Sequence, residues 1–161
     1  MTAAAERVRS RGVDVVPEAS LVAARAADER LGQDTVVLAM GDLLAVTDAF
    51  VIVTGRNARQ VRTIVEAVEA GVKRGTGRAP DRIEGLRELQ WVLMDYGDFV
   101  VHVFLEETRG YYDLERLWSD APRIDWGASE AASQRADASQ APGEGPAASG
   151  PPAQSQPLPP P

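Results

Sequence analysis

Four aspartates of the 161-residue chain have the residue type and spacing that could hold a metal ion. Asp95 and Asp98 meet across a predicted tight turn, and Asp42 and Asp48 flank another connection between predicted strands. Paired carboxylates of this kind can bind Mg²⁺ for phosphoryl transfer. Aspartate and glycine are also what a tight turn requires, and no phosphate-binding loop accompanies them. The turn is the favoured interpretation, and a nucleotidyltransferase-like enzyme using Asp95 and Asp98 is the alternative.

Other catalytic chemistry finds few candidate residues. The chain has one histidine, His102, and no cysteine, so a zinc site would need carboxylates around a single imidazole. The sequence contains no G-x-S-x-G turn for a serine nucleophile, no phosphate-loop motif and no G-x-G-x-x-G motif. We therefore expect no catalytic residue, no metal site and no cofactor, and we predict that the protein is not an enzyme.

The residues from Trp91 to Phe104, WVLMDYGDFVVHVF, predict a β-hairpin. A two-residue turn at Tyr96-Gly97 would pair Asp95 with Asp98 and Trp91 with His102. Because side chains alternate across a strand, one face of the hairpin carries only apolar residues, and the other face is largely apolar with an acidic border. The first face comprises Val92, Met94, Phe99, Val101 and Val103; the second comprises Trp91, Leu93, Asp95, Asp98, Val100, His102 and Phe104.

Two apolar faces mean that the sheet is buried on both sides or that its second face is a docking surface. Aromatic residues at the centre of such a patch are typical of protein interfaces, where they contribute most of the affinity. His102 is then either a contact residue or a structural imidazole beside Trp91. A helix of the same chain, the tail or a second copy of the chain could also cover this face.

The elements that must position these residues can be read from periodicity. Ser20 is a candidate N-cap for a first helix that ends at Gly32, and Asn57 is a candidate N-cap for a second helix with an apolar stripe. Helical spacing returns after Glu106. The pattern predicts an α/β fold, a single compact domain with a mixed five-stranded sheet and helices packed on it. The five strands are expected at residues 35–40, 47–54, 81–85, 91–95 and 98–104.

Composition predicts three parts for the chain. Residues 1–17 are expected to be a flexible extension and residues 18–126 the folded domain. Residues 127–161 hold eight of the eleven prolines and are expected to be a disordered Pro/Ala/Ser/Gly-rich tail. Its final Pro-Leu-Pro-Pro-Pro could alternatively dock as a polyproline helix. No signal peptide or membrane-length apolar run is found, so we expect a cytoplasmic protein that does not enter a membrane.

Charge is distributed unevenly. Residues 55–87 carry eight basic and four acidic side chains, a net charge of plus four, whereas residues 95–125 carry eight acids and three arginines, a net charge of minus five. An acidic end attracts basic partners and repels bare nucleic acid. We therefore expect a basic protein partner and no direct recognition of nucleic-acid sequence.

The segment from Trp91 to Ala121, WVLMDYGDFVVHVFLEETRGYYDLERLWSDA, closely resembles the signature of the ribosomal silencing factor family (RsfS, Iojap-like). The strand at residues 47–55, the helix entry at Asn57 and the Glu84-Gly85 pair resemble it as well, so the resemblance covers residues 19–121. It implies a domain that looks like a degenerate nucleotidyltransferase. It also implies a regulatory protein without an active site.

The resemblance further implies a partner and a mechanism. Family members bind uL14, the universal fourteenth protein of the large ribosomal subunit, at the intersubunit face. They block joining of the small subunit in starvation or stationary phase, and some organellar relatives act in large-subunit assembly. A homodimer through the same or an adjacent apolar face is an alternative. The expected partner-binding residues are those of the second hairpin face, namely Trp91, Leu93, Asp95, Asp98, Val100, His102 and Phe104, with Glu107, Arg109, Tyr112 and Trp118 as secondary or structural ones.

Overall fold

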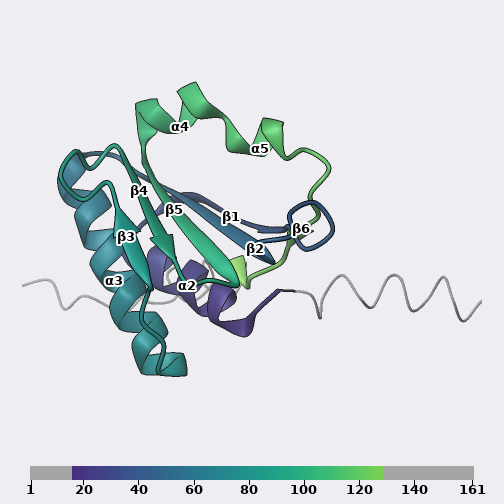
Figure 1. Ribbon diagram of the computed structural model, residues 1–161. Helices are drawn as coiled ribbons and strands as arrows, with labels where there is room; N and C mark the ends of the chain where they lie inside the picture. Colours follow the sequence, from purple (N-terminus) through teal and green to yellow (C-terminus); the bar gives the residue numbers. More distant parts are fainter. Residues whose placement is uncertain (1–15, 129–161) are drawn as a thin grey trace, which may run out of the picture.

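The computed structural model describes residues 16–128. Most of the expected N-terminal extension and nearly all of the expected Pro-rich tail therefore lie outside the described residues. The elements, in chain order, are α2 (Glu18–Glu29), β1 (Gln33–Ala39), β2 (Ala49–Gly55), α3 (Ala58–Thr76), β3 (Arg82–Glu84), β4 (Trp91–Asp95), β5 (Phe99–Leu105), α4 (Glu106–Tyr112), α5 (Leu114–Leu117) and β6 (Arg123–Ile124). They form the mixed α/β domain that the sequence predicts (Figure 1).

The sheet is mixed, with the strand order β3-β4-β5-β2-β1-β6. Only β2 and β5 run parallel, and the other neighbouring pairs are antiparallel. The sheet has six strands, one more than expected. The additional strand, β6, has two residues and follows Pro122, so its sequence is too short to show a strand period.

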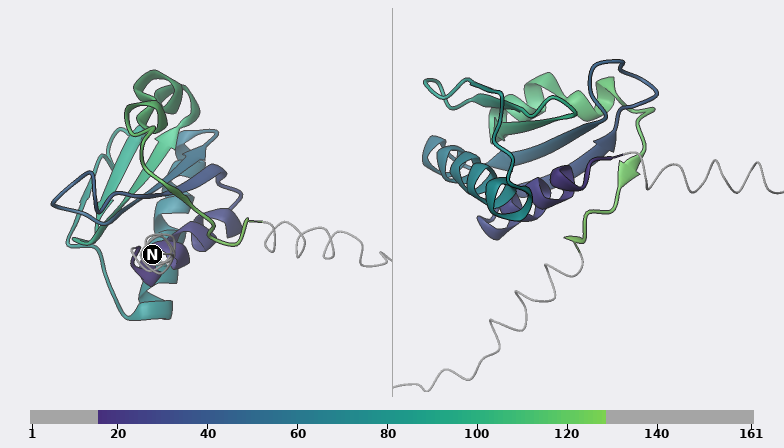
Figure 2. Two further views of the ribbon diagram at one scale, coloured as in Figure 1. Left: turned by 90° about the vertical axis from the view of Figure 1, so that its right-hand side faces the viewer. Right: turned by 60° about the horizontal axis from the view of Figure 1, so that its bottom comes forward.

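Helices α2 and α3 lie side by side on one face of the sheet, while α4 and α5 lie on the other (Figures 1 and 2). The predicted apolar stripe of α3 is confirmed, because Val61, Ile64, Val65, Val68 and Val72 are all buried. Asn57 caps this helix by accepting a hydrogen bond from the Gln60 backbone N–H at 2.9 Å. Gly77 ends it with a left-handed φ of 74°.

The expected N-cap of the first helix was wrong. Helix α2 begins at Glu18, directly after Pro17, and Ser20 lies inside its first turn. The Ser20 hydroxyl donates backward to the Pro17 carbonyl oxygen at 2.6 Å. Proline is favourable just before a helix because its φ is already fixed near the helical value. The proline therefore marks the helix start, and the serine is a buried residue of the helix.

The predicted hairpin register was also wrong, whereas the predicted faces are correct. Asp95 pairs with Val100 and Trp91 with Phe104, so each partner lies two residues further along than expected. Gly97 occupies the first position of the two-residue turn with a φ of 88°, and Asp98 occupies the second. A glycine at that position suits a hairpin turn that needs a positive φ. Because the shift is two residues, every side chain keeps its predicted face.

Within residues 16–128, no helix is both long enough and apolar enough to cross a membrane.

Candidate docking face

The face of the sheet opposite α2 and α3 is only partly covered. Its side chains form three rows, each with one residue from β2, one from β5 and one from β4. The rows become more exposed with increasing distance from α4. The row nearest α4 has Thr54 and Phe104 buried, with Trp91 half-buried. In the furthest row all three members, Phe50, Val100 and Asp95, are half-buried. We use the name aromatic face for five half-buried apolar residues of this side, namely Phe50, Trp91, Leu93, Val100 and Trp118.

Trp91 lies at the edge of this face and is held there by three aromatic neighbours. Its ring stacks on Phe104 at 4.9 Å between centroids and lies 4.6 Å from the Tyr112 ring. The indole N–H donates to Nδ1 of His102 at 3.1 Å. The indole is therefore positioned by the fold and still half-exposed, which is the arrangement that an interface anchor requires.

His102 lies beneath this face and does not form its surface. The side chain is 4 % exposed, and the Phe50 ring packs edge-on against it at 4.7 Å. Burial lowers the pKa of His102 to about 4, so the imidazole is neutral at pH 7. Because Nδ1 accepts the indole hydrogen bond, the ring proton lies on Nε2. Nε2 has no hydrogen-bond partner within the described residues.

The structure therefore favours the structural interpretation of His102 over the expected contact role. The same holds for Phe104, because only 1 % of its surface is exposed. Both were expected to bind a partner, and both instead support the residues that could. The physical reason is the cover provided by Trp91, Phe50 and the α4–α5 segment.

The acidic border of the face is paired within the chain. The Asp98 carboxylate accepts two hydrogen bonds from Arg78, at 2.6 and 3.1 Å, and these bonds raise the pKa of Arg78. Asp95 accepts from the Gly97 backbone N–H at 2.8 Å, and its other oxygen lies 3.4 Å from Arg82. The two aspartates therefore stabilise the turn, and the expected free acidic border at Asp98 is neutralised. Among residues 16–128 there is no group of three or more potential ligands that could hold a metal ion.

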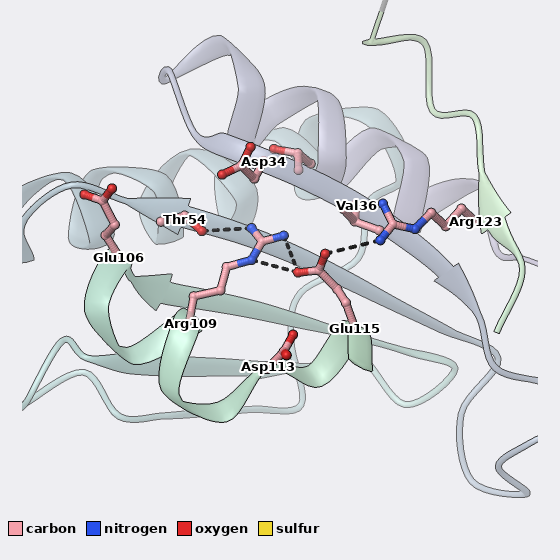
Figure 3. Close-up of a pocket in the computed structure, with 10 residues that line it drawn as sticks. Asp34, Val36, Thr54, Glu106, Arg109, Asp113, Glu115 and Arg123 are labelled. Carbon is pink, nitrogen blue, oxygen red and sulfur yellow. Dashed lines mark hydrogen bonds and ion pairs between the residues drawn. The ribbon is translucent and has the colours of Figure 1, made fainter. Parts of the chain in front are cut away.

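Arg109 connects the α4–α5 segment to the sheet (Figure 3). Its guanidinium donates to the Thr54 hydroxyl at 2.8 Å and twice to one Glu115 oxygen, at 2.9 and 2.6 Å. The other Glu115 oxygen lies 3.4 Å from Arg123. The arginine side chain is only 12 % exposed, and its bonds hold α4 and α5 against the sheet, which favours the structural alternative for this residue. These residues form one wall of a polar pocket of about 570 Å³.

The remaining secondary residues lie on the surface of the same segment. Glu107 is exposed, Tyr112 is 49 % exposed, and Trp118 is half-buried with its ring 6.3 Å from Phe50. Sequence reasoning missed Phe50 as a member of the face. The signal was present, because Phe50 alternates with Ala49 and Val51, which point to the opposite side of the same strand.

These observations define the class of protein. It is a small mixed α/β domain whose described part presents a preorganised aromatic face and no group of three or more potential metal ligands. Residues 14–149 match the family model described as "Ribosomal silencing factor during starvation", and the chain belongs to this family.

Individual relatives agree with this assignment. The chain is 39 % identical over 104 residues to the ribosomal silencing factor RsfS of Bacillus subtilis, covering 65 % of this chain and 87 % of that protein. It is 33 % identical over 89 residues to mouse "Mitochondrial assembly of ribosomal large subunit protein 1", covering 54 % of this chain and 39 % of that protein. A crystal structure of a Chromobacterium violaceum protein matches with a TM-score of 0.61 and 35 % identity, covering 63 % of this chain and 84 % of that one. The names of these relatives describe regulation and assembly of ribosomes, not an enzyme.

Proposed function

We propose that this protein is a ribosomal silencing factor that binds uL14 on the intersubunit face of the large subunit and sterically blocks subunit joining. Membership of the silencing factor family supports the proposal, and the observation that carries it is the aromatic face. This face combines a fixed indole with half-buried aliphatic side chains, the composition of an interface centre. Steric exclusion requires only a stable complex, so no active site is needed.

The charge of the α4–α5 segment also fits a basic ribosomal protein. Glu107 and Asp113 are exposed and form no ion pair within residues 16–128, whereas Glu115 is already paired with Arg109. Unpaired acids at the border of an apolar patch attract a basic partner and accelerate association. In this proposal the acidic contribution comes from Glu107 of α4 and from Asp113 directly after it, because Asp98 is neutralised by Arg78.

A matched pair of substitutions tests the docking face. Leu93 and Val22 are both half-buried aliphatic residues, but Leu93 lies on the aromatic face and Val22 lines a small groove between α2 and α3. We expect Leu93→Glu to weaken co-sedimentation with isolated large subunits at least tenfold, because a carboxylate would be buried without a partner. Val22→Glu should change it by less than twofold. A subunit-joining assay should show the same order.

Trp91→Ala should also weaken binding at least tenfold, corresponding to about 1.4 kcal/mol or more. This variant removes the hydrogen bond to His102 as well, so its folded fraction must be measured by circular dichroism. Trp91→Phe keeps the stacking on Phe104 and should retain most of the stability. If folded Trp91→Ala and Leu93→Glu both bind with wild-type affinity, the proposed docking face is wrong.

A role in assembly of the large subunit is a second candidate, supported by the name of the mouse relative. The two roles differ in what accumulates when the protein is depleted. Loss of an assembly factor produces incomplete large subunits during growth, whereas loss of a silencing factor leaves subunits complete and raises subunit joining in starved cells.

A further inference from the structure

Four arginines gather at one corner of the domain, where α2 ends and α3 begins. Arg30 follows the end of α2, Arg56 follows β2, and Arg59 and Arg62 lie in the first two turns of α3. We call these four residues the arginine corner. Three side-chain hydrogen bonds of Gln60 hold the segments together. Its amide nitrogen donates to the Arg30 and Leu31 carbonyl oxygens at 3.3 and 3.1 Å, and its amide oxygen accepts from the Arg56 backbone N–H at 2.7 Å.

These arginines carry charge that the fold does not neutralise. All four are exposed, and none forms an ion pair within residues 16–128. With the Gln33 side-chain amide turned so that its oxygen faces Arg56, this neutral group accepts two hydrogen bonds from the Arg56 guanidinium at 2.9 Å. The nearest acids in sequence are Glu29, Asp34 and Glu66, and each is exposed.

The placement is unfavourable for the isolated domain. The first turn of α3 contains no acidic residue, although acids there are favoured by the helix dipole and cations are disfavoured. At the other end of the same helix, Lys73 and Arg74 have the favourable placement. Residues that oppose local stability commonly serve binding. An anionic partner at the arginine corner would relieve the repulsion.

The arginine corner lies at the same end of the sheet as Trp91. Gly55 of β2 pairs with Leu105 of β5, and the preceding residue, Phe104, pairs with Trp91 of β4. Thr54 of β2 lies opposite Phe104 and is therefore two strand spacings of about 4.8 Å from Trp91. Arg56 lies two residues further along the chain, so its backbone is roughly 12 Å from that of Trp91. When a partner occupies the aromatic face, the groups that surround this partner and extend past the same end of the sheet therefore reach the arginine corner.

We propose that the arginine corner binds backbone phosphates of ribosomal RNA beside the protein that docks on the aromatic face. The inference rests on the proposed function, since it takes the large subunit as the partner. Guanidinium groups bind phosphate with two parallel hydrogen bonds, and the large subunit presents RNA next to its surface proteins. Contacts to phosphates carry no sequence information, so the corner adds affinity and orientation, not base recognition.

The experiment uses the full chain and isolated large subunits, with the dissociation constant measured between low and moderate KCl. The test variant is Arg56→Gln with Arg59→Gln. The control is Lys73→Gln with Arg74→Gln, which makes the same charge change at the far end of the same helix. We expect the test variant to bind about tenfold more weakly at low salt and to lower the slope of log affinity against log salt by roughly 1 to 2, because two phosphate contacts are lost. The control should match the wild type in both.

Binding to isolated uL14, without RNA, separates the sources of anionic charge. If the test variant binds uL14 as the wild type does and loses affinity only on the large subunit, the RNA contact is supported. If the same loss appears with uL14 alone, the arginines contact acidic protein groups and the RNA proposal is overturned. It is also overturned if the test variant binds the large subunit normally while Leu93→Glu does not, and the docking proposal then stands. If neither variant affects binding to the large subunit, both proposals fail.

Discussion

At the scale of single residues, the neutral histidine beneath Trp91 makes the stability of the domain depend on pH. His102 is buried, and its pKa is lowered from 6.5 to about 4. Between these two values the unfolded chain binds a proton that the folded chain does not, so stability falls as the pH decreases through this range. We expect the free energy of unfolding to drop by about 2 kcal/mol between pH 7.5 and pH 5 through this group alone.

Urea unfolding at the two pH values measures this effect, with His102→Phe as the comparison. The phenylalanine variant cannot titrate at this position, so its stability should change less over the same interval. Equal pH dependence of the two proteins would show that His102 does not titrate as its burial requires.

Substitution of two glycines by alanine is expected to change the stability of the domain in opposite directions. Gly85 has a φ of 89°, and an added Cβ would lie 2.1 Å from the Trp91 carbonyl oxygen. Gly110 lies in α4 with nothing within 4 Å of such a Cβ. Gly85→Ala should therefore destabilise the domain by about 1 to 3 kcal/mol and displace Trp91. Gly110→Ala should stabilise it by about 1 kcal/mol. Thermal unfolding measures both, and an unchanged melting temperature for Gly85→Ala would contradict the close approach.

At the scale of elements, the α4–α5 segment is held on the sheet by the bonds of Arg109 together with the packing of Tyr112, Leu114 and Trp118. Neither helix has a buried residue, and each is short, with seven residues in α4 and four in α5. Arg109 connects the segment to β2 through Thr54 and joins α4 to α5 through Glu115. The segment covers Phe104, so its position determines how much aromatic surface a partner meets.

We predict that Arg109→Ala loosens this segment without unfolding the domain. The free energy of local opening of α4 and α5 should fall by about 2 kcal/mol, because the half-buried Glu115 loses its main partner. Hydrogen exchange should become faster in α4 and α5 and remain unchanged in the middle of α3. Arg109→Lys should not restore protection, since one ammonium group cannot reach Thr54 and Glu115 together. Uniform faster exchange throughout the domain would instead indicate a general loss of stability.

At the scale of the whole molecule, the two sides of the sheet are covered to different extents. One side is closed by α2 and α3, whose alanines and valines form the larger core with β2 and β5 (Figure 2). The other side has a smaller core and leaves part of the sheet uncovered. A single sheet can thus provide stability through one face and recognition through the other.

We expect hydroxyl-radical footprinting of the full chain on large subunits to follow this division. Phe50, Leu93 and Trp118 should become protected on binding, because they are half-buried residues of the aromatic face. Leu21 and Val22 of α2 should react equally in the free and bound protein, because they lie on the closed side. Protection of the α2 residues, with Leu93 still reactive, would place the contact on the opposite side.

The sequence predicted much of the local structure of this domain. The stripe of α3 and the two faces of the β4–β5 hairpin follow from periods of 3.6 and 2, which are properties of the local backbone. The hairpin register was mispredicted because moving the turn by one residue shifts each cross-strand partner by two residues. Such a shift leaves every side chain on the same face, so the pattern of faces cannot distinguish the two turns. Trp91 was selected as a partner-binding residue, and the structure leaves it partly exposed, whereas Phe50 was overlooked although its strand was predicted.

The sequence by itself determined that one hairpin carries two apolar faces and that an acidic and a basic region follow each other along the chain. Only the tertiary structure decided which face α2 and α3 cover, that His102 lies beneath the surface, and that Arg78, twenty residues earlier, neutralises Asp98. The physical reason is that side-chain alternation depends on neighbouring residues alone. Burial and ion pairing depend on distant segments meeting in space, and no local spacing specifies those meetings.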